Sequence, residues 1–462
     1  MKLRGYQQQA VDGLREAFRE GRKRVLLVAP TGAGKTVIFA HLTAALVAAG
    51  QRVLLLAHRD FLLDQIAGTL AAVGVPCGFI AAKRPPALHH RVQVASVQTL
   101  RNRLDVWRPD WIICDEAHHA TAGSWRMVLS AYQSARVVGV TATPQRLDGN
   151  GLGDVFESLV RGPEVRWLME QNFLSTARYF CPATVDTSTL RTRMGEYRAG
   201  DVDAACNTAR VTGEAVAHYR RLCDGAPAVA FCASIRHAEH VAETFCAAGY
   251  RWASLDSSMT DAARRAAVDG LRTGALHGLS SCDIISEGFD LPHVTAAILL
   301  RPTKSLGLHL QQIGRVLRPA HGKAHAVIID HVGNVGRNAD GAWQHNHGFA
   351  DDEREWTLEG KPTRPKAPAV IMCPECFAAY GGGRCPQCGY EREQEPERAI
   401  PTVDESAELE AVDPAAARAQ ERAARTLEDL RAIGEARGYK PGWAWHRWMA
   451  RQKTTKYSFS KI

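Results

Sequence analysis

The stretch Ala29-Pro30-Thr31-Gly32-Ala33-Gly34-Lys35-Thr36 decides the fold because of what stands on either side of it. The apolar run Val25–Val28 before it predicts a buried strand, and the run Val37–Val47 after it predicts a packed helix. Strand, glycine-bearing loop and helix in this order are typical of a phosphate-binding P-loop. Backbone N–H groups and the positive end of the helix dipole would then hold phosphate at Thr31, Gly32, Ala33 and Gly34.

The Lys-Thr pair that ends this stretch adds chemistry to the loop. Lys35 is expected to reach the β- and γ-phosphates of ATP, and the Thr36 hydroxyl is expected to ligate Mg²⁺. A chance glycine-rich turn would seldom combine Lys-Thr with both the strand and the helix. ATP and Mg²⁺ are therefore the expected cofactors.

Two carboxylates follow a second apolar run, Trp111–Cys114, in the string Asp115-Glu116-Ala117-His118. Asp115 is suited to hold Mg²⁺ through water, because Mg²⁺ keeps several waters and uses few protein carboxylates. Glu116 is suited to orient or deprotonate an attacking water. A pair of acidic residues that caps a helix would look the same, but the P-loop upstream favours ATP hydrolysis.

Apolar runs alternate with helical patterns twice along the chain, which predicts two α/β domains with parallel sheets over residues 1–165 and 166–334. Residues from about 145 to 207 lack this alternation and are expected to connect the two. Strands are predicted at 25–28, 52–57, 92–95, 111–114, 137–140, 228–232, 252–255, 276–282, 296–300 and 325–330. Helices are predicted at 7–20, 37–47, 61–73, 211–222, 237–248, 261–271 and 308–317.

The second α/β region lacks a P-loop but carries the string Gln311-Gln312-Ile313-Gly314-Arg315-Val316-Leu317-Arg318. Arg315 and Arg318 lie three residues apart and therefore share one helix face. Arginines from a facing domain can neutralise charge that develops on a transferring γ-phosphate. Solvated surface arginines are the ordinary alternative. Near the start of the chain, the Gln7 amide could read the donor and acceptor edge of adenine, or simply face solvent.

Together these strings resemble the superfamily 2 DExH/D-box helicases and translocases, from about Leu3 to His331. The resemblance implies two tandem RecA-like domains that face each other across ATP, with nucleic acid crossing both. The motifs match at Leu3–Gln7 (the adenine-reading motif), Ala29–Thr36 (I), Ala57–Arg59 (Ia), Ser96–Leu100 (Ib), Asp115–His118 (II), Thr141–Thr143 (III), Phe231–Ser234 (IV), Cys282–Pro292 (V) and Gln311–Arg318 (VI).

The resemblance also implies roles for single residues. Arg315 and Arg318 would be arginine fingers, and His118 would contact Gln311 across the cleft. Nucleotide contacts are implied for Arg4, Gln7, Gly288 and Asp290, and nucleic-acid contacts for Arg59, Ser96, Gln98, Thr99, Ser281 and Cys282. Cys282 stands where the family usually has a phosphate-binding Thr, so Ser281 is an alternative for that contact. Within the superfamily, His58-Arg59, Arg301–Lys304 and Gln312–Arg315 resemble bacterial RadD-type repair helicases and phage-encoded relatives, which implies work in DNA repair or phage replication.

Four of the twelve cysteines crowd into two C-x-x-C pairs, Cys373/Cys376 and Cys385/Cys388. Four thiolates at this spacing can close a tetrahedral zinc site with no open position, so a structural Zn²⁺ is expected. A redox-active cysteine pair is the alternative. A zinc ribbon is therefore predicted over residues 371–391, after a polar linker over 335–370.

The remaining C-terminal residues divide by charge. An acidic tether is predicted over 392–413, followed by a helical, basic and aromatic tail over 414–462. In this tail Trp443, Trp445 and Trp448 either stack on nucleic-acid bases or pack a small helical core. The ribbon or the tail is the expected contact for a protein partner.

Bulk composition agrees with a nucleic-acid enzyme without deciding it. The 462-residue chain carries a net charge of +8, a mild preference for polyanions. No apolar run approaches the ~20 residues that span a bilayer, and the N-terminus lacks a signal-peptide pattern, so we expect no membrane partner and a cytoplasmic protein of a bacterial or phage-infected cell. The expected function is an ATP-dependent DNA helicase or translocase. An RNA helicase, or a nucleic-acid-gated ATPase sensor or remodeller that separates no strands, is the alternative.

Overall fold

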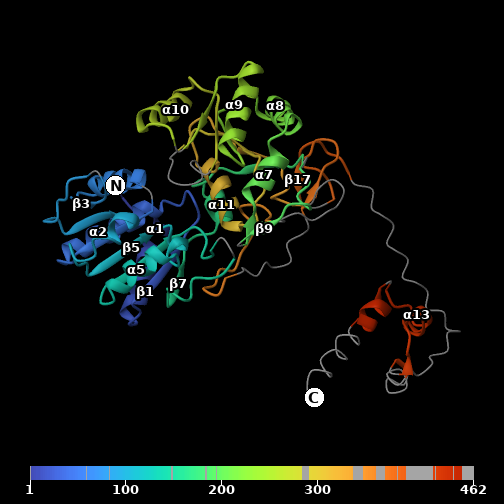
Figure 1. Ribbon diagram of the computed structural model, residues 1–462. Coiled ribbons are helices and arrows are strands. Elements are labelled where there is room, and N and C mark those ends of the chain that lie inside the picture. Colours follow the sequence, from blue (N-terminus) through green and yellow to red (C-terminus); the bar gives the residue numbers. More distant parts are fainter. Residues whose placement is uncertain are drawn as a thin grey trace. The chain divides into compact units, whose positions relative to one another are not determined.

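The computed structural model forms two units, Met1–Arg392 and Glu393–Ile462, which we describe separately (Figure 1). No helix among the residues that it describes is long and apolar enough to cross a membrane. Those residues are 2–58, 60–82, 84–146, 149–182, 185–193, 195–256, 258–282, 291–336, 347–360, 370–381, 383–391, 420–421, 423–440 and 442–449.

The first domain of the larger unit is built on a sheet of seven parallel strands in the order β3-β4-β2-β5-β6-β1-β7. The strands are β1 (Arg24–Val28), β2 (Val53–Ala57), β3 (Gly78–Ile80), β4 (Val92–Ser96), β5 (Trp111–Asp115), β6 (Arg136–Thr141) and β7 (Ser158–Arg161). The helices are α1 (Gly5–Arg19), α2 (Lys35–Ala48), α3 (Asp60–Ala72), α4 (Val97–Leu100), the short η1 (Ala117–His119) and α5 (Gly123–Ala131).

Alternate strand residues of this sheet face two separate cores. Val25 and Leu27 of β1 pack with apolar residues of α1, α2 and α3 on one face. Leu26 and Val28 pack with residues of α4 and α5 on the other face. Because both faces are buried, the strands consist of nearly continuous apolar residues, which is the pattern that parallel sheets require.

The second domain has a six-stranded parallel sheet in the order β12-β13-β11-β14-β15-β8. Its strands are β8 (Ala177–Phe180), β11 (Ala228–Phe231), β12 (Trp252–Leu255), β13 (Gly278–Ser281), β14 (Ala296–Leu299) and β15 (Ala326–Asp330). Its helices are α7 (Ala199–Cys206), α8 (Ala209–Cys223), α9 (Ile235–Ala247), α10 (Asp261–Thr273) and α11 (Leu306–Val316), and α6 (Val165–Glu170) precedes β8. The predicted fold of two parallel-sheet α/β domains is confirmed.

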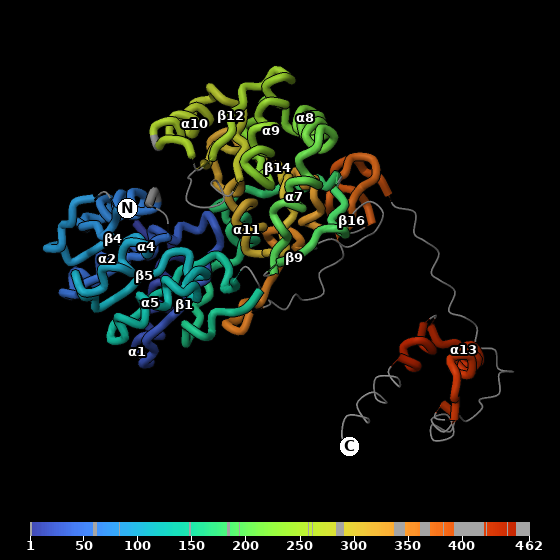
Figure 2. The backbone as a smooth tube through the Cα atoms, viewed as in Figure 1, coloured from blue at the N-terminus to red at the C-terminus, as the bar shows by residue number. Residues whose placement is uncertain are grey.

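Residues 347–360, which we call the strap, contact both domains (the orange loop below the second domain in Figure 2). On the first domain, the Gly153 N–H donates to the Leu358 carbonyl at 2.9 Å, and Leu358 packs against the core beside α5. On the second domain, the Ala350 N–H donates to the Tyr179 hydroxyl at 3.0 Å. The sequence predicts only a polar linker over 335–370, but the strap is a packed element, because its apolar side chains meet partners that lie far away in sequence.

The two C-x-x-C pairs form a small ribbon with an antiparallel pair, β16 (Ile371–Met372) and β17 (Ala379–Tyr380). The ribbon docks on the edge strand β8: the Cys181 N–H donates to the Phe377 carbonyl at 2.9 Å, and Phe180 pairs with Ala378 in an antiparallel bridge. Buried ribbon residues belong to the same hydrophobic core as the second domain. The ribbon is therefore part of that domain's packing.

In the smaller unit, helix α13 (Leu427–Ala436) is capped by Thr426, whose hydroxyl accepts from the Asp429 N–H at 3.1 Å. Leu430 and Ile433 form a small core against which Trp443 and Trp448 pack. Trp445, in contrast, keeps 51% of its surface exposed. The predicted packing of the tryptophans in a small core therefore holds for Trp443 and Trp448, and stacking on bases stays a prediction.

Candidate active site

The P-loop connects β1 to α2, which begins at Lys35. Two of its residues have backbone conformations that favour glycine: Gly32 has φ +90° and Gly34 has φ +79°. A Cβ at Gly32 would lie 2.7 Å from Leu174 Cδ2, and a Cβ at Gly34 would lie 2.5 Å from Gln7 Nε2. The loop therefore favours glycine at both positions because of its backbone conformation, and a Cβ there would also displace the ends of the Leu174 and Gln7 side chains.

The N-terminal residues support this loop from outside. The buried Gln7 donates from Nε2 to the Ala33 carbonyl at 3.2 Å and accepts at Oε1 from the Arg4 N–H at 3.0 Å. The Tyr6 hydroxyl donates to the same Ala33 carbonyl at 3.1 Å. The Arg4 guanidinium lies over the Phe173 ring at 4.5 Å. Gln7 thus positions the phosphate loop, and the adenine contacts of Arg4 and Gln7 stay predictions.

The two carboxylates lie at the carboxyl end of β5. Asp115 Oδ1 accepts from the Glu116 N–H at 3.0 Å. Glu116 has φ +48°, the left-handed conformation that costs a non-glycine residue free energy and that clusters at functional sites. Its Oε2 lies 3.4 Å from His118 Nδ1, and His118 also contacts the Thr141 hydroxyl at 3.3 Å.

The second domain reaches this carboxylate through α11. Gln311 Nε2 donates to Glu116 Oε2 at 3.5 Å, a contact between the two domains. Glu116 Oε2 accepts from Gln311 and lies 3.4 Å from His118 Nδ1, so both side chains approach the same oxygen. The contact of His118 with Gln311 that the resemblance implies stays a prediction. A Cβ at Gly314 would lie 2.5 Å from Thr31 Cβ, so only glycine lets α11 approach the P-loop this closely.

These groups surround one cavity of about 300 Å³. Arg315 is buried at its wall and Arg318 lies beside Gly32. Residues of α3, among them Gln65 and Thr69, complete the lining and were not predicted, because nothing in the sequence of that helix distinguishes its pocket-facing side. The predicted residues that line the cavity are Thr31, Gly32, Gly34, Lys35, Thr36, Asp115, Glu116, Arg315 and Arg318.

The charges in the cavity are strongly coupled. Burial lowers the pKa of Lys35, while the nearby Glu116 and Asp115 carboxylates raise it. Burial, followed by the charge of Glu116, raises the pKa of Asp115 to about 7. The Asp115 carboxylate and the Thr36 hydroxyl are hard oxygen donors, which suit Mg²⁺, and a phosphate chain would meet Lys35, Arg315 and Arg318.

The predicted nucleic-acid residues lie outside this cavity, at the carboxyl ends of other strands. Ser96 ends β4 and donates from Oγ to Gln98 Oε1 at 3.1 Å, with the partly exposed Thr99 next to it. Ser281 ends β13 with a buried hydroxyl, and Cys282 Sγ contacts the Ala233 carbonyl at 3.5 Å. Arg59, Gly288 and Asp290 lie outside the described residues.

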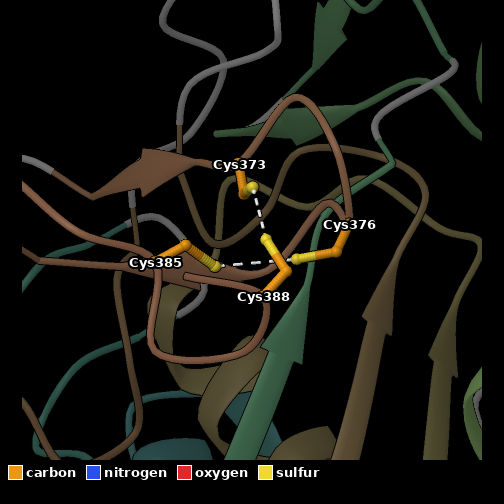
Figure 3. Close-up of side chains that lie close together, drawn as sticks. All are labelled: Cys373, Cys376, Cys385 and Cys388. Carbon is orange, nitrogen blue, oxygen red and sulfur yellow. Dashed lines mark hydrogen bonds between the residues drawn. The ribbon is translucent and has the colours of Figure 1, made fainter. Parts of the chain in front are cut away.

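The four ribbon cysteines point their sulfurs toward one another (Figure 3). Cys373 Sγ lies 3.5 Å from Cys388 Sγ, and Cys376 Sγ lies 3.6 Å from Cys385 Sγ. All four sulfurs lie within 4.8 Å of one another. Sulfurs at the corners of a tetrahedral Zn–S₄ site are about 3.8 Å apart. The cluster therefore has the donor set and the spacing of a metal site.

Two known protein families match this chain, one on each of its two α/β domains. A family described as the type III restriction enzyme res subunit matches residues 1–146. A family described as the helicase conserved C-terminal domain matches residues 214–320. The two matches fall on the P-loop domain and on the domain that carries α11.

Among curated relatives, a 51.5 kDa protein of a Lactococcus phage is 32% identical over 79% of this chain and 78% of its own length. The Saccharomyces cerevisiae protein IRC3, assigned as an ATP-dependent helicase, is 30% identical over 72% of this chain. The match spans only 51% of the length of IRC3. Among solved structures, an HsdR-subunit fragment of a type I restriction enzyme from Vibrio vulnificus has a TM-score of 0.60 at 21% identity, covering 79% of this chain and 68% of that one.

The chain belongs to the superfamily 2 helicases of the DExH type. Its class is therefore a nucleic-acid-dependent ATP hydrolase that uses ATP and Mg²⁺ and binds nucleic acid.

Proposed function

We propose that this protein is a DNA helicase or translocase in which the two RecA-like domains close over ATP and convert its hydrolysis into movement on DNA. The observation that carries the proposal is the shared cavity, where the P-loop and carboxylates of one domain meet the arginines of the other. A nucleotide in that cavity would touch both domains. Its hydrolysis would then change how the domains sit on a bound strand.

Each side chain has one task in this mechanism. Lys35 would bind the β- and γ-phosphates, and Thr36 and Asp115 would hold Mg²⁺, which would supply charge neutralisation at those phosphates. Glu116 accepts a proton from the attacking water, and His118 and Gln311 position its carboxylate. Arg315 and Arg318 stabilise the negative charge of the transition state.

DNA is favoured over RNA by the families of the relatives. The first domain matches the res subunit of type III restriction enzymes, and a type I restriction enzyme subunit, EcoAI of Escherichia coli, is 29% identical over 188 residues, 37% of this chain and 23% of that subunit. Against this stands the fold likeness to yeast Dbp5, solved with RNA, at a TM-score of 0.52 and 14% identity over 72% of this chain and 84% of that one. RNA is therefore the second candidate substrate.

We also assign Zn²⁺ to the four ribbon cysteines as a structural ion, since four thiolates leave no open coordination position. The ribbon and the exposed Trp445 are the proposed surfaces for a protein or DNA partner. Ser96, Gln98, Thr99, Arg59, Ser281 and Cys282 are proposed to contact the nucleic-acid backbone.

ATPase assays with single-stranded DNA, duplex DNA, forked DNA and RNA test the proposal. We expect DNA to stimulate turnover, and translocation to displace a third strand from a DNA triplex. Stimulation by RNA alone would contradict the DNA assignment, and stimulation without displacement or unwinding would favour a nucleic-acid-gated sensor. In the Glu116→Gln variant we expect ATP to remain bound and unhydrolysed; rapid turnover in that variant would contradict the assigned role of Glu116.

A further inference from the structure

An insertion between β8 and α8 belongs to neither the sheet nor the ATP site. Its described residues are 185–193 and 195–207, and they include an antiparallel pair of β9 (Thr192–Arg193) and β10 (Glu196–Tyr197), followed by α7. The described helicase motifs do not include it. Its position suggests a function of its own.

The insertion is held at the carboxyl edge of the second sheet. The Glu196 carboxylate accepts from the Thr303 hydroxyl at 2.6 Å and from the Lys304 N–H at 3.0 Å, in the loop that follows β14. Asp203 of α7 is hydrogen-bonded to the Ser234 hydroxyl, in the loop that follows β11. Because β11 and β14 are parallel neighbours, both loops lie at the same edge. Ligands of parallel α/β sheets bind outside this edge.

Three carboxylates of the insertion, Glu196, Asp201 and Asp203, are hydrogen-bonded within the fold. Asp201 receives two hydrogen bonds from the Arg191 guanidinium, at 2.8 and 2.7 Å. In contrast, Arg193, Arg198 and Lys304 are exposed. Arg191 and, to a smaller extent, Arg198 lower the pKa of Asp201, and Lys304 belongs to the loop that follows β14. The insertion and this loop therefore place three exposed cations at the ligand-binding edge.

An aromatic side chain lies within this cluster. Lys304 Nζ lies 5.1 Å from the centre of the half-buried Tyr197 ring. This contact orders a flexible lysine next to the hairpin and lowers the entropy cost of using it in binding. Glu196 acts in the same direction, since its bonds hold the hairpin against the loop that carries Lys304.

We propose that the insertion is a phosphate-binding surface for the nucleic acid on which the ATPase depends, with Arg193, Arg198 and Lys304 as contacts and Glu196 as a positioning residue. The inference rests on the proposed function and adds a contact that the helicase motifs do not supply. Guanidinium groups suit this role because their fork of N–H donors matches two phosphate oxygens. The surface would hold the strand against the second domain while the first domain cycles.

The test uses the full chain and fluorescein-labelled oligo(dT), with oligo(U) as a second arm, titrated at several KCl concentrations. Neutralising all three cations (Arg193→Gln, Arg198→Gln, Lys304→Gln) should raise Kd at least about tenfold at moderate salt. It should also reduce the slope of log Kd against log salt by about 2, because each single-strand phosphate contact contributes about 0.7. ATP turnover without nucleic acid should be unchanged.

Two variants that each remove one cation, at different edges of the second sheet, separate the effect of position from the effect of charge. Arg193→Gln should weaken binding, whereas Arg272→Gln should not, although both remove one exposed cation from the second domain. Arg272 lies at the end of α10, near the start of β13 and hence at the opposite edge of the sheet. Glu196→Ala should weaken binding about as much as Arg193→Gln, and Glu196→Gln, which keeps an acceptor oxygen, should restore part of it.

The outcomes separate this inference from the function on which it rests. If the wild-type chain is stimulated by nucleic acid and the triple variant keeps its Kd and salt slope, the insertion is not the phosphate surface, and a protein partner becomes the better occupant. If neither DNA nor RNA binds or stimulates the wild-type chain, the proposed function itself fails.

Discussion

The two RecA-like domains share a parallel sheet and helix-covered faces, but they present different groups to the cavity. The first domain supplies its groups from loops at strand ends: the P-loop after β1, and Asp115 and Glu116 at the end of β5. The second domain supplies Gln311 and Arg315 from helix α11, and Arg318 from the residues just after it. The predicted sharing of one helix face by the two arginines is wrong, because α11 ends at Val316. A loop at a strand end surrounds phosphate with backbone N–H groups, whereas a helix offers side chains on one face.

This difference indicates a division of labour. The first domain can hold a nucleotide by itself, because its glycines and Lys35 need no partner. The second domain can only complete a site that the first has begun, through Arg315 and the contact of Gln311 with Glu116. Binding should therefore depend mainly on the first domain, and turnover should depend on both.

The largest expected effects come from removing one cation on each side of the cavity. Lys35→Ala should abolish turnover and weaken ATP binding, because the phosphates lose their direct partner. Arg315→Ala should lower kcat by about 10³ or more, the range of arginine fingers, with little change in ATP affinity. Fluorescent-nucleotide titration measures the ATP affinity of each variant, and steady-state kinetics measures its kcat. An equal loss of ATP affinity in both variants would contradict the proposed division of labour between the domains.

A second, smaller effect should follow from a single methyl group between the domains. Gly314→Ala places a Cβ 2.5 Å from Thr31 Cβ and pushes α11 away from the P-loop. A displacement of about 1 Å can cost about 10² in rate, so kcat should fall by that order while ATP still binds. Gly213→Ala, in α8, is the matched control, since its Cβ would have nothing within 4 Å. Unchanged turnover in Gly314→Ala would mean that this close approach is not required.

Loss of the ribbon metal should affect the two domains unequally. We expect one zinc per chain, lost in Cys373→Ser, with a fall of about 2 kcal/mol or more in the local stability of β8 and β15, because the ribbon packs into the second core. Hydrogen exchange and metal analysis measure both changes. Cys246→Ser, at an exposed cysteine, should change neither. Equal loss of protection in β1 and β6 would contradict a local role for the ribbon.

The smallest expected effect is the loss of stability of the second domain at acidic pH. Burial lowers the pKa of His237 to about 4 and that of His331 to about 3, while burial raises the pKa of Asp330 to about 6. Below pH 6.5 the two histidines are neutral in the folded chain and protonated in the unfolded chain, so unfolding takes up two protons. Between about pH 6 and pH 4, Asp330 is protonated in the folded chain and ionised in the unfolded chain, so unfolding releases one proton there. The net uptake of about one proton should lower the stability of the second domain by roughly 1 kcal/mol per pH unit in that range.

His237→Asn tests this pH dependence, because an asparagine oxygen can accept the Ala233 N–H bond that His237 Nδ1 now accepts at 3.3 Å. The variant should show a flatter loss of second-domain protection as pH falls from 6.5 to 4. A slope equal to that of the wild-type chain would exclude His237 as the titrating group.

The sequence predicted most regular elements because their signals are local. The predicted helix 308–317 and the observed α11 (Leu306–Val316) differ by two residues or fewer at each end. The P-loop glycines, Asp115 and Arg315 were equally visible, because their residue types are tied to their chemistry. Strands β3, β7 and β8 were missed, because each lies at the edge of its sheet and lacks the continuous apolar run of the strands inside the sheet.

The strap and the hairpin insertion were missed for a related reason. In the strap, Leu358 and Ala350 are defined by contacts with Gly153 and Tyr179, which are distant in sequence. In the insertion, the role of Glu196 depends on its hydrogen bond with the Thr303 hydroxyl, and the sequence alone does not distinguish it from an ordinary surface acid. Such contacts are properties of the folded chain.

The docking of the ribbon on β8 also affects the tendency of the protein to self-associate. β8 is the last strand of its sheet, and an open strand edge offers unpaired N–H and C=O groups to any other chain. The ribbon covers part of that edge through the Phe377 carbonyl and the Phe180–Ala378 bridge. Metal loss would therefore uncover a surface for self-association, so colloidal stability depends on the ribbon, whereas the ATPase cycle depends on α11.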